Sequence, residues 1–201
     1  VSNSKIKKMK KHILKIALCA TLMGTVTSCR DALDIVQEGE LSNENVFKSP
    51  EDMKRFLDGD IYRSMGLSST IRFSALFTDE VGIGPSYSGF AQDIHQFFVD
   101  TTTGEASSLW INNYYVINRV LVLLEGANLI KPSTTAEQAL YNSYLAEARA
   151  LRAFSYLQLL QHFSTDMSDP EALGVVLLDR IPNVDDMPAR VTNSAIYSVI
   201  E

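Results

Sequence analysis

Charged side chains in the stretch YLAEARALRAFSYLQLLQHF, residues 144–163, are the first candidates for catalytic chemistry. Glu147, Arg149 and Arg152 could act on a glycosidic bond only if a second carboxylate lay across a cleft at a defined distance. All three instead share one predicted helix with an apolar stripe, where charged residues usually pair with groups on neighbouring helices. We interpret them as structural ion pairs between helices and assign no catalytic residue.

Metal and phosphate chemistry find little support in the sequence. After the first 28 residues the chain has two histidines, His95 and His162, and one cysteine, Cys29, whereas a structural zinc site needs four nitrogen or sulfur ligands. His162 lies near the end of a predicted helix, where a cation interacts favourably with the helix dipole. The glycines at positions 82 and 84 lack the third glycine and the following helix of a phosphate-binding loop. We predict no metal and no cofactor.

The first 28 residues have the pattern of an export signal. They carry six lysines and no acidic side chain, which is typical of a positive n-region. The stretch ILKIALCATLMGTV, residues 13–26, is apolar apart from Lys15 and two threonines. It is too short to cross a bilayer, which needs roughly 20 apolar residues. Met9 opens a signal of ordinary length, so the eight residues before it are either part of the signal or an upstream extension.

The signal ends in Val26, Thr27, Ser28 and Cys29, an order that resembles the lipobox of bacterial lipoprotein signal peptides. This resemblance implies that residues 1–28 are removed and that Cys29 carries the lipid anchor, because in that family the cysteine thiol is alkylated with diacylglycerol. The acyl chains then hold the protein to a membrane, since each buried methylene contributes about 0.8 kcal/mol. The alternative is a short N-terminal transmembrane anchor with an incidental cysteine.

Removal of the signal changes the charge balance of the chain. It leaves 12 basic residues against 24 acidic ones, a formal net charge of −12, which disfavours nucleic acid and anionic lipid as partners. Cys19 leaves with the signal and Cys29 takes the lipid, so no disulfide or thiolate nucleophile remains. The mature chain has the size of one globular domain.

Residues 29–48 are acidic and lack helical periodicity, which predicts an extended leader. A first helix begins where Ser49 caps, Pro50 occupies the first position and Asp52 completes a capping box. Its apolar residues recur at helical spacing until Gly66, which ends it. Residues 67–108 contain many turn-forming residues, and we interpret them as a loop-rich insert with room for one helix.

Two strong helices follow the insert. The first carries an apolar stripe that begins with Trp110, interpreted as a core residue, and Gly126 is a candidate for its C-cap. The second begins at a capping box from Thr134 to Glu137 and runs through Phe163, with apolar residues nearly all the way round, which predicts burial on both sides. Two antiparallel helices joined by a short turn form the unit of a helical repeat.

The C-terminal part begins with the run GVVLL, residues 174–178, which predicts a strand or an extended segment. An acidic linker between Pro182 and Pro188 follows. A last helix begins near Thr192 or Asn193 and is still amphipathic at Ile200. The sequence stops at Glu201, only about nine residues into this helix, whereas stable helices average about three turns. We therefore expect the sequence to be a truncated chain or a gene fragment.

Several stretches together resemble the N-terminal part of the SusD/RagB family of nutrient-binding outer-membrane lipoproteins. They are the lipobox with Leu33 and Asp34 after it, GELSNENVFKSPEDMKRFLDGDIYRSM, LWINNYYVINRVL, ARVTNSAIYSVIE and, most specifically, YLAEARALRAFSYLQLLQHF. The resemblance covers essentially the whole chain, although members of the family are usually more than twice as long. It departs from the family pattern at Asn118-Arg119, at Phe163-Ser164 and at Ala195.

The resemblance implies an all-α fold of tetratricopeptide-like helix pairs with a loop-rich insert, truncated before the C-terminal half. The expected organisation is a lipoprotein signal peptide at 1–28, an extended leader at 29–48 and an incomplete SusD-like helical domain at 49–201. The implied function is non-catalytic. The protein would be lipid-anchored to the outer membrane, exposed at the cell surface, and would capture an oligosaccharide or polysaccharide. It delivers this glycan to a SusC-like TonB-dependent transporter.

Ligand contact is expected in the segment 82–100. Away from the helix stripes, only this segment combines flat aromatic faces with groups that bind hydroxyls, as saccharide binding requires. Tyr87 and Phe90 could stack on a sugar ring, and Gln92, Asp93 and His95 could bind its hydroxyls. In the family the region before the Trp-containing helix contributes to ligand contact. The alternative is that Tyr87 and Phe90 only pin the loop to the core.

Two other classes of function stay open. A helical-repeat scaffold lipoprotein would bind protein partners only, and it would show no affinity for glycans. A surface glycoside hydrolase would need paired acids on facing strand ends, and the sequence predicts no such strands. The identity of the glycan does not follow from the sequence.

Overall fold

The computed structural model describes residues 46–78, 80–86, 88, 89, 91–100 and 102–201, which all belong to one compact unit. Cys29, the predicted signal and most of the predicted leader lie outside the described residues. In chain order the elements are α3 (Pro50–Phe56), the π-helix η1 (Leu57–Ile61), α4 (Tyr62–Ser64), α5 (Leu67–Phe77), α6 (Gln92–His95), α7 (Gly104–Ala127), α8 (Thr135–Phe163), β1 (Leu173–Val176), β2 (Arg190–Thr192) and α9 (Asn193–Ile200). The described part is mostly helical, as predicted.

The first helical segment begins with the predicted capping box and ends at the predicted glycine. The carboxylate of Asp52 accepts hydrogen bonds from the backbone N–H of Ser49 and from its hydroxyl, both at 2.9 Å, and Gly66 has a left-handed φ of 55°. The segment is not one regular α-helix, because η1 interrupts it. Met53, Leu57 and Ile61 are nevertheless all fully buried, since residues spaced by four are about one helical turn apart and therefore lie on the same face.

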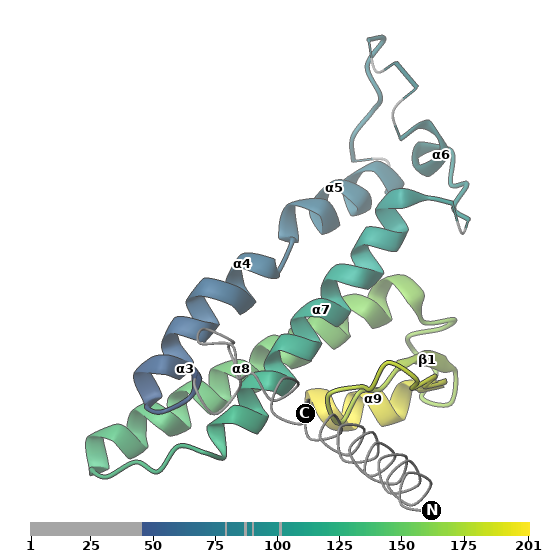
Figure 1. Ribbon diagram of the computed structural model, residues 1–201. Coiled ribbons are helices and arrows are strands. Elements are labelled where there is room, and N and C mark those ends of the chain that lie inside the picture. The colour runs from purple at the N-terminus through teal and green to yellow at the C-terminus, as the bar shows by residue number, and fades with distance from the viewer. Residues whose placement is uncertain (1–45, 79, 87, 90, 101) are drawn as a thin grey trace, which may run out of the picture. The chain divides into compact units, whose positions relative to one another are not determined.

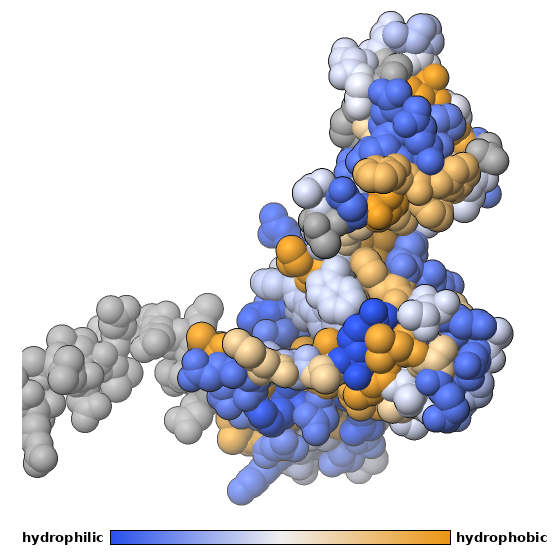
Figure 2. Space-filling view, turned by 90° about the vertical axis from the view of Figure 1, so that its right-hand side faces the viewer, coloured by the Kyte–Doolittle hydropathy of each residue, from blue (hydrophilic) through white to orange (hydrophobic). Residues whose placement is uncertain are grey.

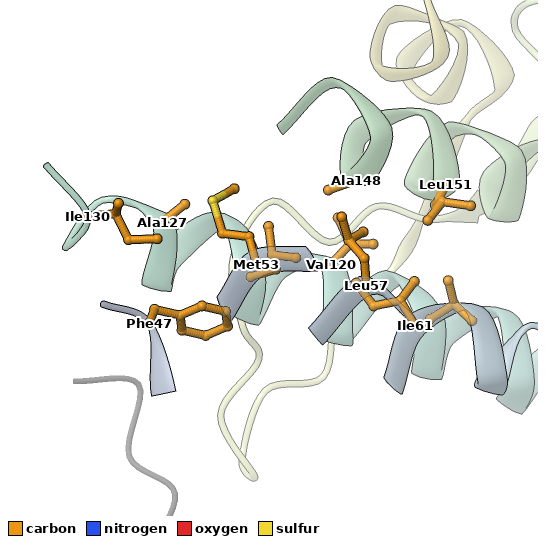
Figure 3. Close-up of a cluster of buried hydrophobic side chains, with 11 residues drawn as sticks. Phe47, Met53, Leu57, Ile61, Val120, Ala127, Ile130, Ala148 and Leu151 are labelled. Carbon is orange, nitrogen blue, oxygen red and sulfur yellow. The ribbon is translucent and has the colours of Figure 1, made fainter. Parts of the chain in front are cut away.

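A long antiparallel helix pair, α7 and α8, forms the centre of the fold, and α3, α4 and α5 follow one another along α7 (Figure 1). The predicted helix pair is therefore confirmed, although α7 begins before Trp110. The main core lies where α3 and η1 meet this pair, and the aliphatic side chains drawn in Figure 3 point toward one another there. Phe47, which lies in the range predicted for the leader, is 2% exposed and belongs to this core.

Gly126 does not cap α7, contrary to the prediction. It is a buried residue inside the helix, whose C-cap is Asn128. A Cβ atom at this position would lie 2.0 Å from Cδ2 of the Phe47 ring. The absence of a side chain at Gly126 therefore lets the aromatic ring lie directly against the helix backbone.

The long helix α8 begins at its predicted capping box, since the hydroxyl of Thr134 accepts a hydrogen bond from the N–H of Glu137. The Glu137 carboxylate reaches one residue further back than a standard capping box, to the N–H of Ser133. The prediction that α8 is buried on both sides is wrong for its first half, because all its buried residues lie from Ala148 onward. In the first half, Tyr141, Tyr144 and Leu145 are only partly buried against the main core, so that half is covered on one face.

The C-terminal part packs against the end of the helix pair where α8 finishes. Strand β1 confirms the predicted extended run, and it pairs antiparallel with β2, which the sequence did not reveal. Helix α9 begins at Asn193, as predicted. These elements share a second apolar cluster with α7 and α8, in which Trp110 is half-buried and packs edge-on against Phe163 with ring centroids 5.0 Å apart.

Candidate functional site

The candidate site lies around α6, in the part of the insert beyond the beginning of α7 (Figure 1). Ile94 is fully buried and anchors the single turn of α6 in a small apolar cluster with Phe73, Ala91 and Leu109. Phe73 belongs to α5 and Leu109 to α7. Two helices of the main fold therefore hold the short helix in place.

The predicted site residues have different positions in the structure. Gln92 and Asp93 are exposed on the first turn of α6, whereas His95 is half-buried. The Nδ1 atom of His95 is enclosed and has no hydrogen-bond partner among the described residues. Tyr87 and Phe90 lie outside the described residues. The segment expected to be a loop contains a helical turn at residues 92–95, which is formed around Ile94.

Two aromatic residues that the sequence pattern did not single out, Phe97 and Phe98, follow α6 directly. Their exposed fractions are 56% and 64%. The Phe97 ring packs edge-on against Phe77 of α5, with ring centroids 5.3 Å apart, and the N–H of Phe98 donates to the carbonyl of Asp93 over 2.8 Å. The two exposed aromatic residues are thus held directly after the polar turn of α6. The sequence signal that could have identified them is the presence of two adjacent aromatic residues in a turn-rich segment. Two neighbouring side chains rarely both point into the same core, so at least one of them is expected to be exposed.

The backbone around α6 is strained. Ser88, Ala91 and Phe97 have φ values of 53°, 55° and 59°, and they are the non-glycine residues with positive φ in the described part of the chain. Such conformations cost of order 1–3 kcal/mol each, and they cluster at ligand sites and switch regions. Figure 2 shows apolar surface beside polar surface on this upper part of the molecule.

This arrangement has the chemistry of a saccharide-binding surface. An aromatic face can cover the C–H face of a pyranose ring, a carboxamide can donate to and accept from its hydroxyls, and a carboxylate can accept from them. Phe98, Gln92 and Asp93 supply these three groups within one short segment.

Hydrogen bonds join Glu147 of α8 to α4 and Arg152 of α8 to the segment after β1, so the expected ion pairs between helices are corrected for these two residues. The Tyr62 hydroxyl donates to Glu147 over 2.6 Å, and this hydrogen bond raises the pKa of Tyr62 to about 12. Arg152 donates to the carbonyl of Leu178 over 2.6 Å, and Arg149 is exposed. Arg152 donates to a backbone carbonyl rather than to a carboxylate because, among the described residues, no acidic side chain lies within ion-pair distance of it.

His162 lies in the last turn of α8, as predicted. Its Nδ1–H donates to the carbonyl of Gln158 over 2.7 Å, and its Nε2 lies 3.3 Å from the hydroxyl of Ser74 on α5. It therefore fastens the helix end to the insert. Among the described residues, no cluster of three or more His, Cys, Asp or Glu side chains could hold a metal ion. Within the same part of the chain, none of the helices has the length and apolarity needed to span a membrane.

Comparison with protein-family models finds no match, and no curated protein matches in sequence. Solved structures do match. A SusD superfamily protein from Bacteroides fragilis is 22% identical, with a TM-score of 0.61 over 77% of this chain and 38% of that protein. A SusD homolog from Bacteroides thetaiotaomicron is 24% identical, with a TM-score of 0.62 over 80% of this chain and 30% of that protein.

A candidate sugar-binding protein from Bacteroides vulgatus is 22% identical, with a TM-score of 0.65 over 77% of this chain and 35% of that protein. The chain therefore has the SusD-like fold that its sequence predicted. It spans between 30% and 38% of the length of these three structures.

Proposed function

We propose that the protein is a non-catalytic, SusD/RagB-type surface lipoprotein that captures an oligosaccharide or polysaccharide and delivers it to a SusC-like TonB-dependent transporter of the outer membrane. The SusD-like fold and the sugar-binding description of one structural neighbour support this proposal. The lipobox-like ending at Cys29 supports the lipid anchor. An upstream transporter gene next to the coding sequence would support the delivery step.

The observation that carries the proposal is the exposed aromatic surface beside the polar turn of α6. Phe98 is the more exposed of the two phenylalanines, and Gln92 and Asp93 lie on the same short segment. Tyr87 and Phe90 remain proposed ligand residues, because they precede α6 in the same part of the chain. His95 also remains a proposed ligand residue, although it is half-buried and its Nδ1 is enclosed.

A Phe98→Ala variant is expected to bind glycan about three- to tenfold more weakly, because one aromatic contact is worth roughly 0.5–1.5 kcal/mol beyond its buried area. Retention in native gels containing starch, xylan or mannan measures the effect. The melting temperature should stay nearly unchanged, since the side chain is 64% exposed.

Tyr115→Ala is the matched control for this experiment, because Tyr115 is a 49% exposed aromatic on α7, away from α6. It should leave retention unchanged. Equal weakening by both variants would contradict a specific role for the α6 surface. A wild-type protein that no glycan retards would favour the alternative, a scaffold that binds protein partners only.

A Cys29→Ala variant is expected to move the protein from the membrane fraction to the soluble fraction. The reason is that stable anchoring requires acyl chains, which this substitution removes. Fractionation in high salt measures the distribution, and Cys19→Ala is the control because Cys19 precedes the proposed cleavage position. Persistent sedimentation of the Cys29→Ala variant with outer membranes would refute the lipid anchor.

A further inference from the structure

A polar hollow lies between the helix pair and the segment that leaves β1. It has a volume of about 660 Å³, and its lining comes from α7 and its C-cap, from α8 and from residues 179–183. This volume is within the range of roughly 300–1,000 Å³ that is usual for small-molecule sites. The lining residues are Leu121, Leu124, Glu125, Asn128, Arg152, Asp179, Arg180, Ile181 and Asn183. None of them belongs to the α6 surface.

The walls of the hollow are held in place by hydrogen bonds. The N–H of Leu178 donates to the Tyr156 hydroxyl over 2.8 Å, and that hydroxyl donates back to the Leu178 carbonyl over 3.2 Å. The N–H of Asn183 donates to the Asp186 carboxylate over 2.8 Å. A site with fixed walls loses little conformational entropy when a ligand binds.

Several polar groups of the lining are not engaged. The side chains of Glu125, Asn128, Asp179 and Asn183 are exposed and make no hydrogen bond or ion pair with the described residues. The carboxamides of Asn128 and Asn183 can donate and accept hydrogen bonds, and the carboxylates of Glu125 and Asp179 can accept them. The hollow therefore offers both donors and acceptors to a ligand.

The charges of the hollow disfavour an anionic ligand. Arg180 already forms an ion pair with Asp186 over 2.7 Å, and the other charges of the lining are the carboxylates of Glu125 and Asp179 and the guanidinium of Arg152. Two positive and three negative groups leave a formal net charge of −1. Like charges brought into contact repel each other. Hydroxyl groups, which both donate and accept, match the mixed carboxylate, carboxamide and guanidinium lining, and the aliphatic residues Leu121, Leu124 and Ile181 can cover an apolar C–H face.

We propose that this hollow is a second ligand site, which binds a small uncharged polyol of the size of a monosaccharide or disaccharide. It is separate from the α6 surface and does not depend on the function proposed for that surface. Carboxylate and carboxamide groups would bind the hydroxyls of the ligand, and aliphatic side chains would contact its C–H face. The lining residues include no aromatic ring.

Titration of the isotope-labelled protein with cellobiose, followed by NMR, tests the proposal. The side-chain amide signals of Asn128 and Asn183 should shift with saturation, and the double variant Asn128→Ala/Asn183→Ala should bind cellobiose about tenfold more weakly, because two hydrogen bonds are lost. Glu125→Ala, on a different lining side chain, should weaken binding in the same direction. Glucuronate should bind at least several-fold more weakly than cellobiose.

Gln161→Ala is the matched control, because Gln161 is an exposed carboxamide on α8 that does not line the hollow. It should leave cellobiose affinity unchanged, and so should Phe98→Ala, which separates this site from the α6 surface. The proposal is overturned if the amide signals do not respond to cellobiose, if neither the double variant nor Glu125→Ala weakens binding, or if glucuronate binds as tightly.

Discussion

A Gly126→Ala variant is expected to unfold about 2–4 kcal/mol more easily than the unmodified protein. The added Cβ would lie 2.0 Å from a carbon of the Phe47 ring, so either the ring must leave its site or the helix must shift. Overpacking of this kind costs about 1–3 kcal/mol, and loss of a buried phenylalanine about 3–5 kcal/mol. The higher helix propensity of alanine offsets up to about 1 kcal/mol of this. The midpoint of urea unfolding measures the change.

The companion variant Phe47→Ala identifies the cause. In that background the ring is missing, so Gly126→Ala should be neutral or stabilising by up to about 1 kcal/mol. Gly59→Ala is the control, because Gly59 is also helical and a Cβ added there would have no neighbouring atom within 4 Å, so this substitution should not destabilise. An equal loss of stability with and without the Phe47 ring would show that the close approach is not the reason for glycine at position 126.

An Asn193→Ala variant is expected to lose about 2–3 kcal/mol of stability. The fully buried side chain of Asn193 donates to the carbonyls of Asp166 and Asp169, over 2.6 Å and 2.8 Å, and accepts from the Ser164 hydroxyl over 2.9 Å. Substitution removes three hydrogen bonds, each with a net contribution of about 0.5–1.5 kcal/mol. The two carbonyls keep their backbone partners, the N–H groups of Asp169 and Ala172. Partial exposure of the carbonyls to water moderates the sum.

Hydrogen exchange and urea unfolding together measure the Asn193→Ala effect. Exchange should accelerate first in β1 and α9, because Asn193 joins the loop after α8 to the beginning of α9. Ser198→Ala on the exposed face of α9 is the control and should change stability by less than about 0.5 kcal/mol. A uniform acceleration over α3 and α7 with no change near α9 would contradict the proposed role of Asn193.

The α6 surface shows how far sequence reasoning reached at the candidate site. The composition of residues 82–100 pointed to the correct segment for exposed Gln92 and Asp93. It did not identify Phe97 and Phe98 as the exposed aromatics, because their exposure depends on Ile94 and Phe77 occupying the apolar cluster beneath them. Composition gives the residues of a surface, whereas packing decides which of them face solvent.

Local signals in the sequence determined where α3 and α8 begin and where the first helical segment ends. Ser49 with Asp52, Thr134 with Glu137 and the left-handed Gly66 act through hydrogen bonds and backbone angles within a few residues, so they can be recognised without knowledge of the fold. The helix pair and the strand β1 followed from periodicity and from short apolar runs for the same reason.

Only the tertiary structure decided the role of Gly126, the partner strand β2, the restriction of buried residues to the second half of α8 and the polar hollow beside Arg152. Each of these depends on groups that are remote in the sequence and meet only after folding. An apolar stripe along a helix shows which face can be buried, but it does not specify what covers that face. That choice is made by the close packing of side chains from several elements, which a pattern along one chain does not contain.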